Sequence, residues 1–313
     1  VKKVLEEMEA DRLRKYPDPT ASILVKELAS YYGLNEDQVF VGVGSDDVLA
    51  MSFLTFFNSD KPVLFPDVTY SFYKVWADLF KVPFETPVLK EDFTIDVKDY
   101  EKENGGVIFP NPNAPTGVYM PLDQVEEILK ANQDVVVIVD EAYVDFAGPS
   151  ALELLDKYEN LLVVQTFSKS RSMAGMRIGF AMGHPDLIRA LNDVKYSYNS
   201  YTMNLPSLLA GVEAVKDKEY FEKTIEKIVA TRERAKKRLT ELGFTFPNSQ
   251  SNFIFASHKS VPAGKIFEAL KKEQIYVRYF KTPGLDNSLR ISIGTDEEMD
   301  TLFRFLEAYL PNA

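Results

Sequence analysis

The sequence has 313 residues, of which 45% are hydrophobic, enough to bury the core of one large domain or two moderate ones. Lys and Arg total 36 against 47 Asp and Glu, which gives a net charge of −11 and a pI near 4.9. Because the chain has no cationic excess to release counterions from phosphates, nucleic acids and anionic membranes are poor candidates as partners.

Two further absences narrow the class of protein. No apolar stretch reaches the roughly 20 residues that span a bilayer, and "VKKVLEEMEADRLRKYP" lacks the apolar centre of a signal peptide, so we expect a soluble cytoplasmic protein. The chain has no cysteine and only two histidines, His184 and His258, both beside turn-forming residues. We therefore predict no metal site and no Ser/His/Asp triad. If the protein is an enzyme, its chemistry depends on lysine, carboxylate, tyrosine and a bound cofactor.

The first two thirds of the chain alternate between two patterns. Short apolar runs rich in β-formers occupy residues 38–44, 62–66, 106–110, 134–140, 160–167 and 177–183. Segments with helical periodicity lie between them or follow them, at residues 45–57, 69–80, 121–132 and 184–194. This alternation predicts an α/β fold with a mostly parallel sheet sandwiched by helices, in which ligands gather at the carboxyl ends of the strands.

The pattern changes after residue 205. A long charged helical stretch at residues 217–242 is followed by apolar runs and two further helices, at 251–256, 264–273, 274–280, 288–294 and from 296 onward. This order is typical of a smaller α+β domain. We predict a large domain at residues 20–205 and a small one at 206–313, with residues 1–19 packing as an N-terminal arm.

Two strands end in groups that can react. "VVVIVDEAY" leads from a buried strand into Asp140, and "NLLVVQTFSK" leads from another into Ser168 and Lys169. Each has a plain alternative: Asp140 as a capping acid and Lys169 as a surface amine. Together, however, an amine and an acid in one crevice suit pyridoxal 5'-phosphate. Its aldehyde bonds a lysine as a Schiff base, and its pyridine nitrogen needs an anionic partner.

Other residues fit the remaining parts of that cofactor. A helix start at "VGVGSDD", the Ser168 hydroxyl and Arg177 would bind its phosphate. An asparagine of "FPNPNAPTG" and the Tyr143 hydroxyl would donate to the ring oxygen, and Tyr70 would cover the ring, although a core aromatic is the rival interpretation. Arg290, between apolar neighbours on a strand, must find an anion, either on a substrate or on a structural acid.

In this order "NPNAPTG", "DEAY" and "TFSKSRSMAGMRIG" resemble the motifs of fold type I aminotransferases, and most closely those of histidinol-phosphate aminotransferases. The resemblance covers nearly the whole chain, since "RKYPDPTA", "VGVGSDDVL", "PDVTYSFY", "VRYF" and "LRISIGTDEE" are also similar to that family. It implies a transaminase that moves an amino group between glutamate/2-oxoglutarate and a phosphorylated or carboxylated amine. The amine that the family suggests is L-histidinol phosphate, with 3-(imidazol-4-yl)-2-oxopropyl phosphate as its ketone, in histidine biosynthesis.

The resemblance also implies roles for single residues. Lys169 is the Schiff-base lysine and proton shuttle, Asp140 the partner of the pyridinium and Tyr143 the donor to the ring oxygen. Arg290 receives a substrate anion, with Arg278 nearby. The remaining cofactor-binding residues implied are Ser45, Asp46, Tyr70, Asn113, Ser168, Arg177 and, from the partner subunit of a homodimer, Tyr16.

The chain departs from the family's pattern in two places. Many relatives have asparagine immediately before "PTG", where this chain has Ala114, and Asn113 lies one residue earlier. The segment that usually precedes the "YPD" motif is missing ahead of Val1. An aromatic aminotransferase or a threonine-phosphate decarboxylase would use almost the same residues, and a noncatalytic ligand-binding relative is a third alternative.

Overall fold

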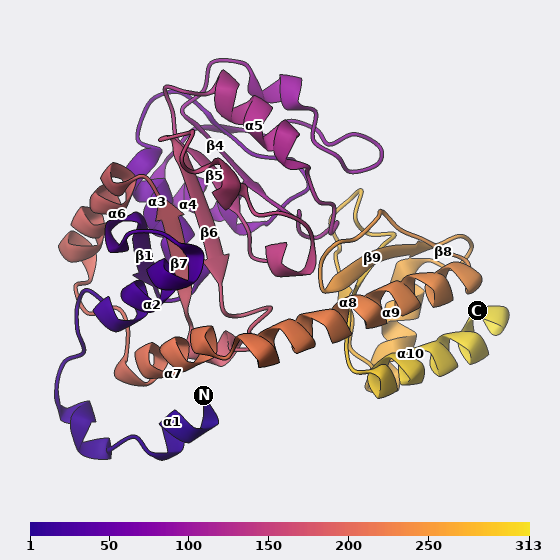
Figure 1. Cartoon of the computed structure of the whole chain (residues 1–313). Coiled ribbons are helices and arrows are strands. Elements are labelled where there is room, and N and C mark those ends of the chain that lie inside the picture. The colour runs from indigo at the N-terminus through magenta and orange to yellow at the C-terminus, as the bar shows by residue number, and fades with distance from the viewer.

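The computed structural model describes residues 1–313, which fold into two regions, each built on its own β-sheet (Figure 1). The larger sheet has the strand order β1-β7-β6-β5-β4-β2-β3. Its strands are Val39–Gly42 (β1), Val63–Leu64 (β2), Phe84–Glu85 (β3), Gly106–Pro110 (β4), Val137–Asp140 (β5), Leu161–Thr166 (β6) and Gly179–Gly183 (β7).

The strand directions match the sequence prediction. Strands β6, β5, β4, β2 and β3 pair in parallel, whereas β7 runs antiparallel to both of its neighbours, β1 and β6. Each predicted apolar run contains one strand, and the predicted fold class is confirmed. Within this sheet only β3 was missed, because this edge strand has two residues and neither Phe84 nor Glu85 is fully buried.

Helices cover both faces of this sheet, as the alternating pattern predicted. They are Ser22–Tyr32 (α2), Ser45–Phe56 (α3), Phe72–Phe80 (α4), Leu122–Ala131 (α5), Pro185–Tyr198 (α6) and Leu205–Lys216 (α7). Side chains of α2, α5 and α7 form one apolar core with the sheet, and those of α3, α4 and α6 form another. Along β5, Val139 belongs to the first core and Ile138 to the second, because successive side chains of a strand point to opposite faces.

The smaller sheet is antiparallel, with the strand order β10-β11-β9-β8. It consists of Phe244–Thr245 (β8), Phe253–His258 (β9), Arg278–Tyr279 (β10) and Leu289–Ser292 (β11), covered by Ala263–Lys272 (α9) and Asp296–Tyr309 (α10). At the other end of the chain, the short helix Lys2–Glu6 (α1) and the 3-10 turn Ala10–Arg14 bury no residue. No helix combines the length with the apolar character that crossing a bilayer requires.

One long helix, Lys218–Glu241 (α8), connects the two sheets (Figure 1). Ile225 and Ile228 pack on a small apolar cluster at the junction, and Ala235 and Leu239 belong to the core of the smaller sheet. Helix α7, by contrast, contributes to the core of the larger sheet. The division into residues 20–205 and 206–313, with 1–19 as an arm, stays a prediction, and the packing of α7 favours placing the division within α8.

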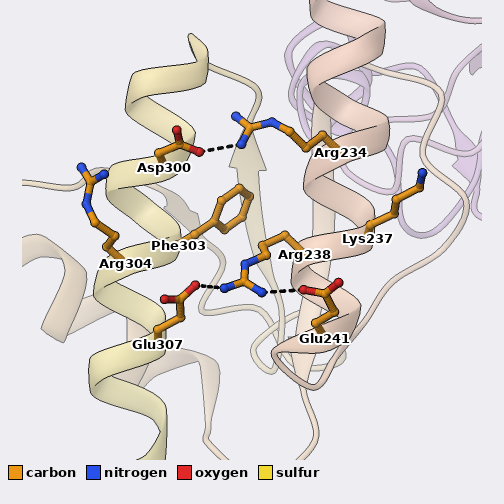
Figure 2. A pocket seen from close by; sticks show the side chains of 8 residues that line it. All are labelled: Arg234, Lys237, Arg238, Glu241, Asp300, Phe303, Arg304 and Glu307. Carbon is orange, nitrogen blue, oxygen red and sulfur yellow. Dashed lines mark hydrogen bonds and ion pairs between the residues drawn. The ribbon is translucent and has the colours of Figure 1, made fainter.

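Ion pairs connect the outer faces of α8 and α10 (Figure 2). Arg234 pairs with Asp300, and Arg238 lies between Glu241 of its own helix and Glu307 of α10. The side chains of Arg238 and Glu307 are 40% and 42% exposed. Water and salt screen such pairs, so they add little to the stability of the smaller domain compared with its apolar core.

Two adjacent residues of α8, Arg238 and Leu239, allow the stability contributions of the ion pairs and of the apolar core to be compared. We expect Leu239→Ala, at a fully buried position, to lower the free energy of unfolding by about 2–5 kcal/mol. Arg238→Ala should have a far smaller effect, and added salt should diminish it further. Urea denaturation at low and high salt tests this prediction; comparable losses for the two variants would contradict it.

Candidate active site

A pocket lies at the carboxyl ends of the parallel strands, where the sequence placed the chemistry. It is lined by Ser45, Asp46, Tyr70, Pro110, Ala114, Asp140, Ala142, Tyr143, Ser168, Lys169, Ala174, Arg177 and Arg290. Strands β4, β5 and β6 are neighbours, so the segments that follow them reach the same place. The structure thus brings together all the predicted site residues except Asn113, Arg278 and Tyr16.

Asp140, the last residue of β5, forms the floor of this pocket. Its carboxylate is 4% exposed and accepts hydrogen bonds from the Tyr73 hydroxyl at 2.7 Å and the Ala142 N–H at 3.2 Å. Burial raises the pKa of Asp140 to about 6, and the bond from Tyr73 opposes that rise only in part. A positive charge in the pocket would therefore stabilise the ionised carboxylate.

Tyr73, on α4, was missed by the sequence analysis. Its side chain is fully buried and packs among the aromatic residues of α3 and α4, so nothing in its local pattern separates it from a core residue. The available signal was its spacing from Tyr70. Tyr70 lies just before α4, and the Tyr73 N–H donates to Tyr70 O at 3.2 Å, so the turn that starts the helix brings position 73 close to a site residue at position 70.

Lys169 lies in the segment after β6, close to Tyr143. Its Nζ is 5.3 Å from the centroid of the Tyr143 ring, and its positive charge lowers the pKa of Asp140, although less than burial raises it. Tyr143 in turn packs edge-on against Phe253 of β9, with the ring centroids 5.1 Å apart. The Lys169 amine therefore lies near the Tyr143 ring, and that ring packs on a strand of the smaller sheet.

The opposite end of the pocket is suited to an anion. Arg177 Nη1 donates to Ser168 Oγ at 3.4 Å, and Arg177 Nη2 lies 3.9 Å from Asp46 at the start of α3. The first N–H groups of a helix have no intrahelical acceptor, so Ser45 and Asp46 present free donors here. Gly44 has a φ of +87°, a left-handed conformation that favours glycine, and a Cβ there would displace the Arg177 guanidinium, whose Nη2 would lie 2.4 Å away.

Tyr70 and Arg290 complete the lining. The Tyr70 hydroxyl donates to Asp46 at 2.8 Å, and burial together with this bond raises the pKa of the phenol. Arg290 enters from β11 of the smaller sheet, with its guanidinium 5.1 Å from the Phe253 ring. Its Nε is buried without a hydrogen-bond partner. An orphaned charged donor is costly, and an anionic ligand would satisfy it.

The structure does not place three predicted residues in the pocket. The Asn113 amide donates to Val68 O and Thr116 Oγ1 and its oxygen accepts from Thr69, so its polar atoms hold the loop together while Ala114 faces the pocket. Arg278 is opposite Arg290 in the sheet register but is exposed.

Tyr16 is the third of these residues. Its side chain is 81% exposed, with its ring centroid 4.7 Å from that of Tyr201. Within one chain it therefore belongs to the surface, where a second subunit could reach it.

Glu141, next to Asp140, points away from the pocket. Its carboxylate accepts from Ser150 Oγ, the Ala151 N–H and Gln165 Nε2, at 2.6 to 2.9 Å. Burial raises its pKa to about 7 in spite of these bonds. Of the two acids in "DEAY", only Asp140 is available to a ligand.

The comparisons with known proteins agree with this geometry. A family model described as aminotransferase class I and II matches residues 1–306. A histidinol-phosphate aminotransferase of Brachyspira hyodysenteriae is 50% identical over 313 residues, which cover 100% of this chain and 88% of that protein. The chain therefore belongs to the class I and II aminotransferases.

Solved structures share the fold. The histidinol-phosphate aminotransferase of Clostridium acetobutylicum matches with a TM-score of 0.91 at 24% identity, over 100% of this chain and 95% of that one. The histidinol-phosphate aminotransferase of Sinorhizobium meliloti, solved in complex with pyridoxal-5'-phosphate, matches with a TM-score of 0.85 at 25% identity, over 96% and 83% of the two chains.

The raised pKa of Asp140 predicts a pH-dependent stability. The ordinary pKa is 3.8 and the folded one about 6, so the folded protein keeps the proton to a higher pH than the unfolded chain does. The resulting stability is present below pH 4 and is lost as the pH rises through 6. Between pH 4 and 7 the cofactor-free protein should therefore lose up to about 3 kcal/mol relative to Asp140→Asn. Urea denaturation across this range tests it, and parallel curves would contradict it.

Proposed function

We propose that this aminotransferase uses pyridoxal 5'-phosphate to move the amino group of L-histidinol phosphate to 2-oxoglutarate. The products are 3-(imidazol-4-yl)-2-oxopropyl phosphate and L-glutamate, and the pathway is histidine biosynthesis. The observation that carries the proposal is a pocket with Asp140, Lys169 and Arg177 around it, in a chain 50% identical over its length to a histidinol-phosphate aminotransferase.

The residues present fit the cofactor. Asp140 would partner the pyridine nitrogen, because a buried carboxylate whose pKa has risen to about 6 gains most from a cation beside it. Lys169 would bond the aldehyde carbon, and the Tyr143 hydroxyl would donate to the ring oxygen. The phosphate would be held by the group already described around Arg177, namely Ser45, Asp46, Ser168 and Arg177, with Tyr70 over the ring.

Each residue then has a defined task in the reaction. The bound cofactor supplies an electron sink for the carbon that carries the substrate's amino group. The substrate's amine would first take the place of Lys169 at the aldehyde carbon, which frees the lysine amine. Lys169 Nζ would then remove the proton from the substrate carbon and deliver it to the former aldehyde carbon, acting as general base and then as general acid. Tyr73 holds the Asp140 carboxylate in one orientation through its 2.7 Å hydrogen bond. Asp140 keeps its negative charge at neutral pH, which favours a protonated pyridine.

Arg290 would recognise the substrate. Histidinol phosphate carries a phosphate and 2-oxoglutarate carries carboxylates, so one arginine can bind the two substrates in turn, the first through its phosphate and the second through a carboxylate. Arg290 lines the pocket, and its guanidinium would supply the donors for this purpose. Arg278 would act only from the rim, because it is exposed on β10.

The proposal also covers the oligomeric state and the cellular location of the protein. The active unit would be a homodimer in which Tyr16 of one chain, 81% exposed here, reaches the phosphate end of the other chain's pocket. The biosynthetic reaction, which consumes 2-oxoglutarate and releases glutamate, would take place in the cytoplasm.

A coupled assay tests the function. Purified protein with histidinol phosphate and 2-oxoglutarate should release glutamate, whereas an aromatic aminotransferase would prefer aromatic amino acids as donors. A threonine-phosphate decarboxylase would release carbon dioxide from threonine phosphate instead. Absence of turnover with all of these donors would refute transamination and favour a noncatalytic binder.

The role of Lys169 gives a direct chemical prediction. Borohydride reduction of the protein with bound cofactor should leave a pyridoxyl group on Lys169, as peptide mapping would reveal. Lys169→Ala should lower turnover by about 10³-fold or more, since the covalent link and the proton shuttle are both removed. Lys157→Ala, at an exposed lysine, serves as the control. A label on another lysine would refute the assignment.

Shared sites can be tested by mixing two inactive chains. Tyr16→Phe and Lys169→Ala chains should each be poorly active. In a heterodimer, the site that keeps Lys169 receives an intact Tyr16 from the other chain, so that one site should recover activity. Purified heterodimers without any recovery would show that Tyr16 does not cross to the partner, and a fully active monomer by light scattering would refute the dimer.

A further inference from the structure

The segment that carries Lys169 is a closed turn. Met173 N donates to Phe167 O at 3.0 Å, and Ser172 N donates to Lys169 O at 3.1 Å. Ser172 adopts a φ of +54°, a left-handed conformation that a residue other than glycine adopts only when its surroundings enforce it. Something outside the turn must therefore hold it in place.

Arg171, two residues after Lys169, makes the most extensive outside contact. Its Nη1 donates to Ala214 O, near the end of α7, at 2.7 Å. The guanidinium carbon lies 4.1 Å from the centroid of the Phe221 ring on α8, and 5.2 Å from those of Tyr31 on α2 and Phe167. A planar cation among three aromatic rings and a carbonyl fits in few orientations.

A second contact holds the other side of the turn. Ser170, which is 3% exposed, donates its hydroxyl to Asp145. Asp145 belongs to the 3-10 turn Val144–Phe146, directly after Tyr143. Of the two residues that follow Lys169, Ser170 is therefore bonded to the segment after Tyr143, and Arg171 is bonded to the corner between α7 and α8.

We propose that Arg171 is a positioning residue, which fixes the reach and direction of the Lys169 amine by clamping its turn to Ala214 and Phe221. Arg171 does not line the pocket, so its effect passes through the backbone of the turn. The proposal rests on the proposed function in one respect, that Lys169 is the lysine that bonds the cofactor.

Lys218 offers a matched control. Its Nζ lies 5.0 Å from the centroid of the same Tyr31 ring, but Lys218 is on α8 and is not part of the Lys169 turn. If only a cation beside Tyr31 mattered for this corner, the two residues would be equivalent. If the attachment of the turn matters, only Arg171 should affect Lys169.

The experiment compares Arg171→Met, Arg171→Lys and Lys218→Met with the unaltered protein. Cofactor is added to the cofactor-free proteins, and the rate of covalent attachment to Lys169 is followed by absorbance and by borohydride trapping. We expect Arg171→Met to slow attachment and to lower kcat by about tenfold each, with KM within about twofold, because misplacing a reacting group affects the chemical step more than binding. Arg171→Lys should be intermediate, and Lys218→Met unchanged.

The outcomes separate the possibilities. Normal attachment and kcat in Arg171→Met would overturn the proposal, as would an equal loss in Lys218→Met, which would indicate a general weakening of the corner. If Arg171→Met fails to fold, Phe221→Leu removes the nearest ring from α8 and should show the same slow attachment with unchanged KM; normal attachment there would overturn the proposal. An unaltered protein that never attaches cofactor at Lys169 would refute the proposed function itself, and with it this role.

Discussion

The burial of one carboxylate, that of Asp140, governs the arrangement of the pocket. A carboxylate at 4% exposure loses most of its hydration, and burial raises its pKa to about 6. The Tyr73 hydroxyl and the Ala142 N–H offset part of that cost. The remainder is best offset by a cation, which the ring nitrogen of a protonated pyridine would provide under the proposed function. The buried acid destabilises the free protein, but the same burial would strengthen its attraction to a bound cation.

The sheet explains why the other groups meet at that acid. Asp140 ends β5, and the parallel strands β4 and β6 on either side end in the segments that hold Ala114 and Lys169. Parallel strands place such segments on one edge, while the helices that return the chain cover the faces. Arg177 comes back to this edge on the turn before the antiparallel strand β7. Three short segments, which follow β4, follow β5 and connect β6 to β7, thus form one pocket.

The sequence predicted the features that have a local cause. Continuous apolar runs between turn residues mark the buried strands, and a charged residue at the end of such a run must face the edge of the sheet. This pattern predicted that Asp140 and Lys169 lie close together, and both line the pocket. Tyr73 and Arg171 escaped because their partners, Asp140 and Phe221, lie far away in the chain. We predicted that Asn113 would reach the cofactor, but hydrogen bonds within the protein hold its amide away from the pocket. Sequence propensities do not report which way a loop side chain points.

Both domains contribute residues to the site, and direct contacts join these residues across the two domains. The smaller domain supplies Arg290, and its Phe253 packs against both that guanidinium and the Tyr143 ring. Arg232, 6% exposed on α8, donates to Phe146 O in the larger domain and to Ser251 O in the smaller one. Helix α8 also carries Phe221, the ring nearest Arg171, so one helix contacts the Lys169 turn at its start and packs further along on the core of the sheet that carries Arg290.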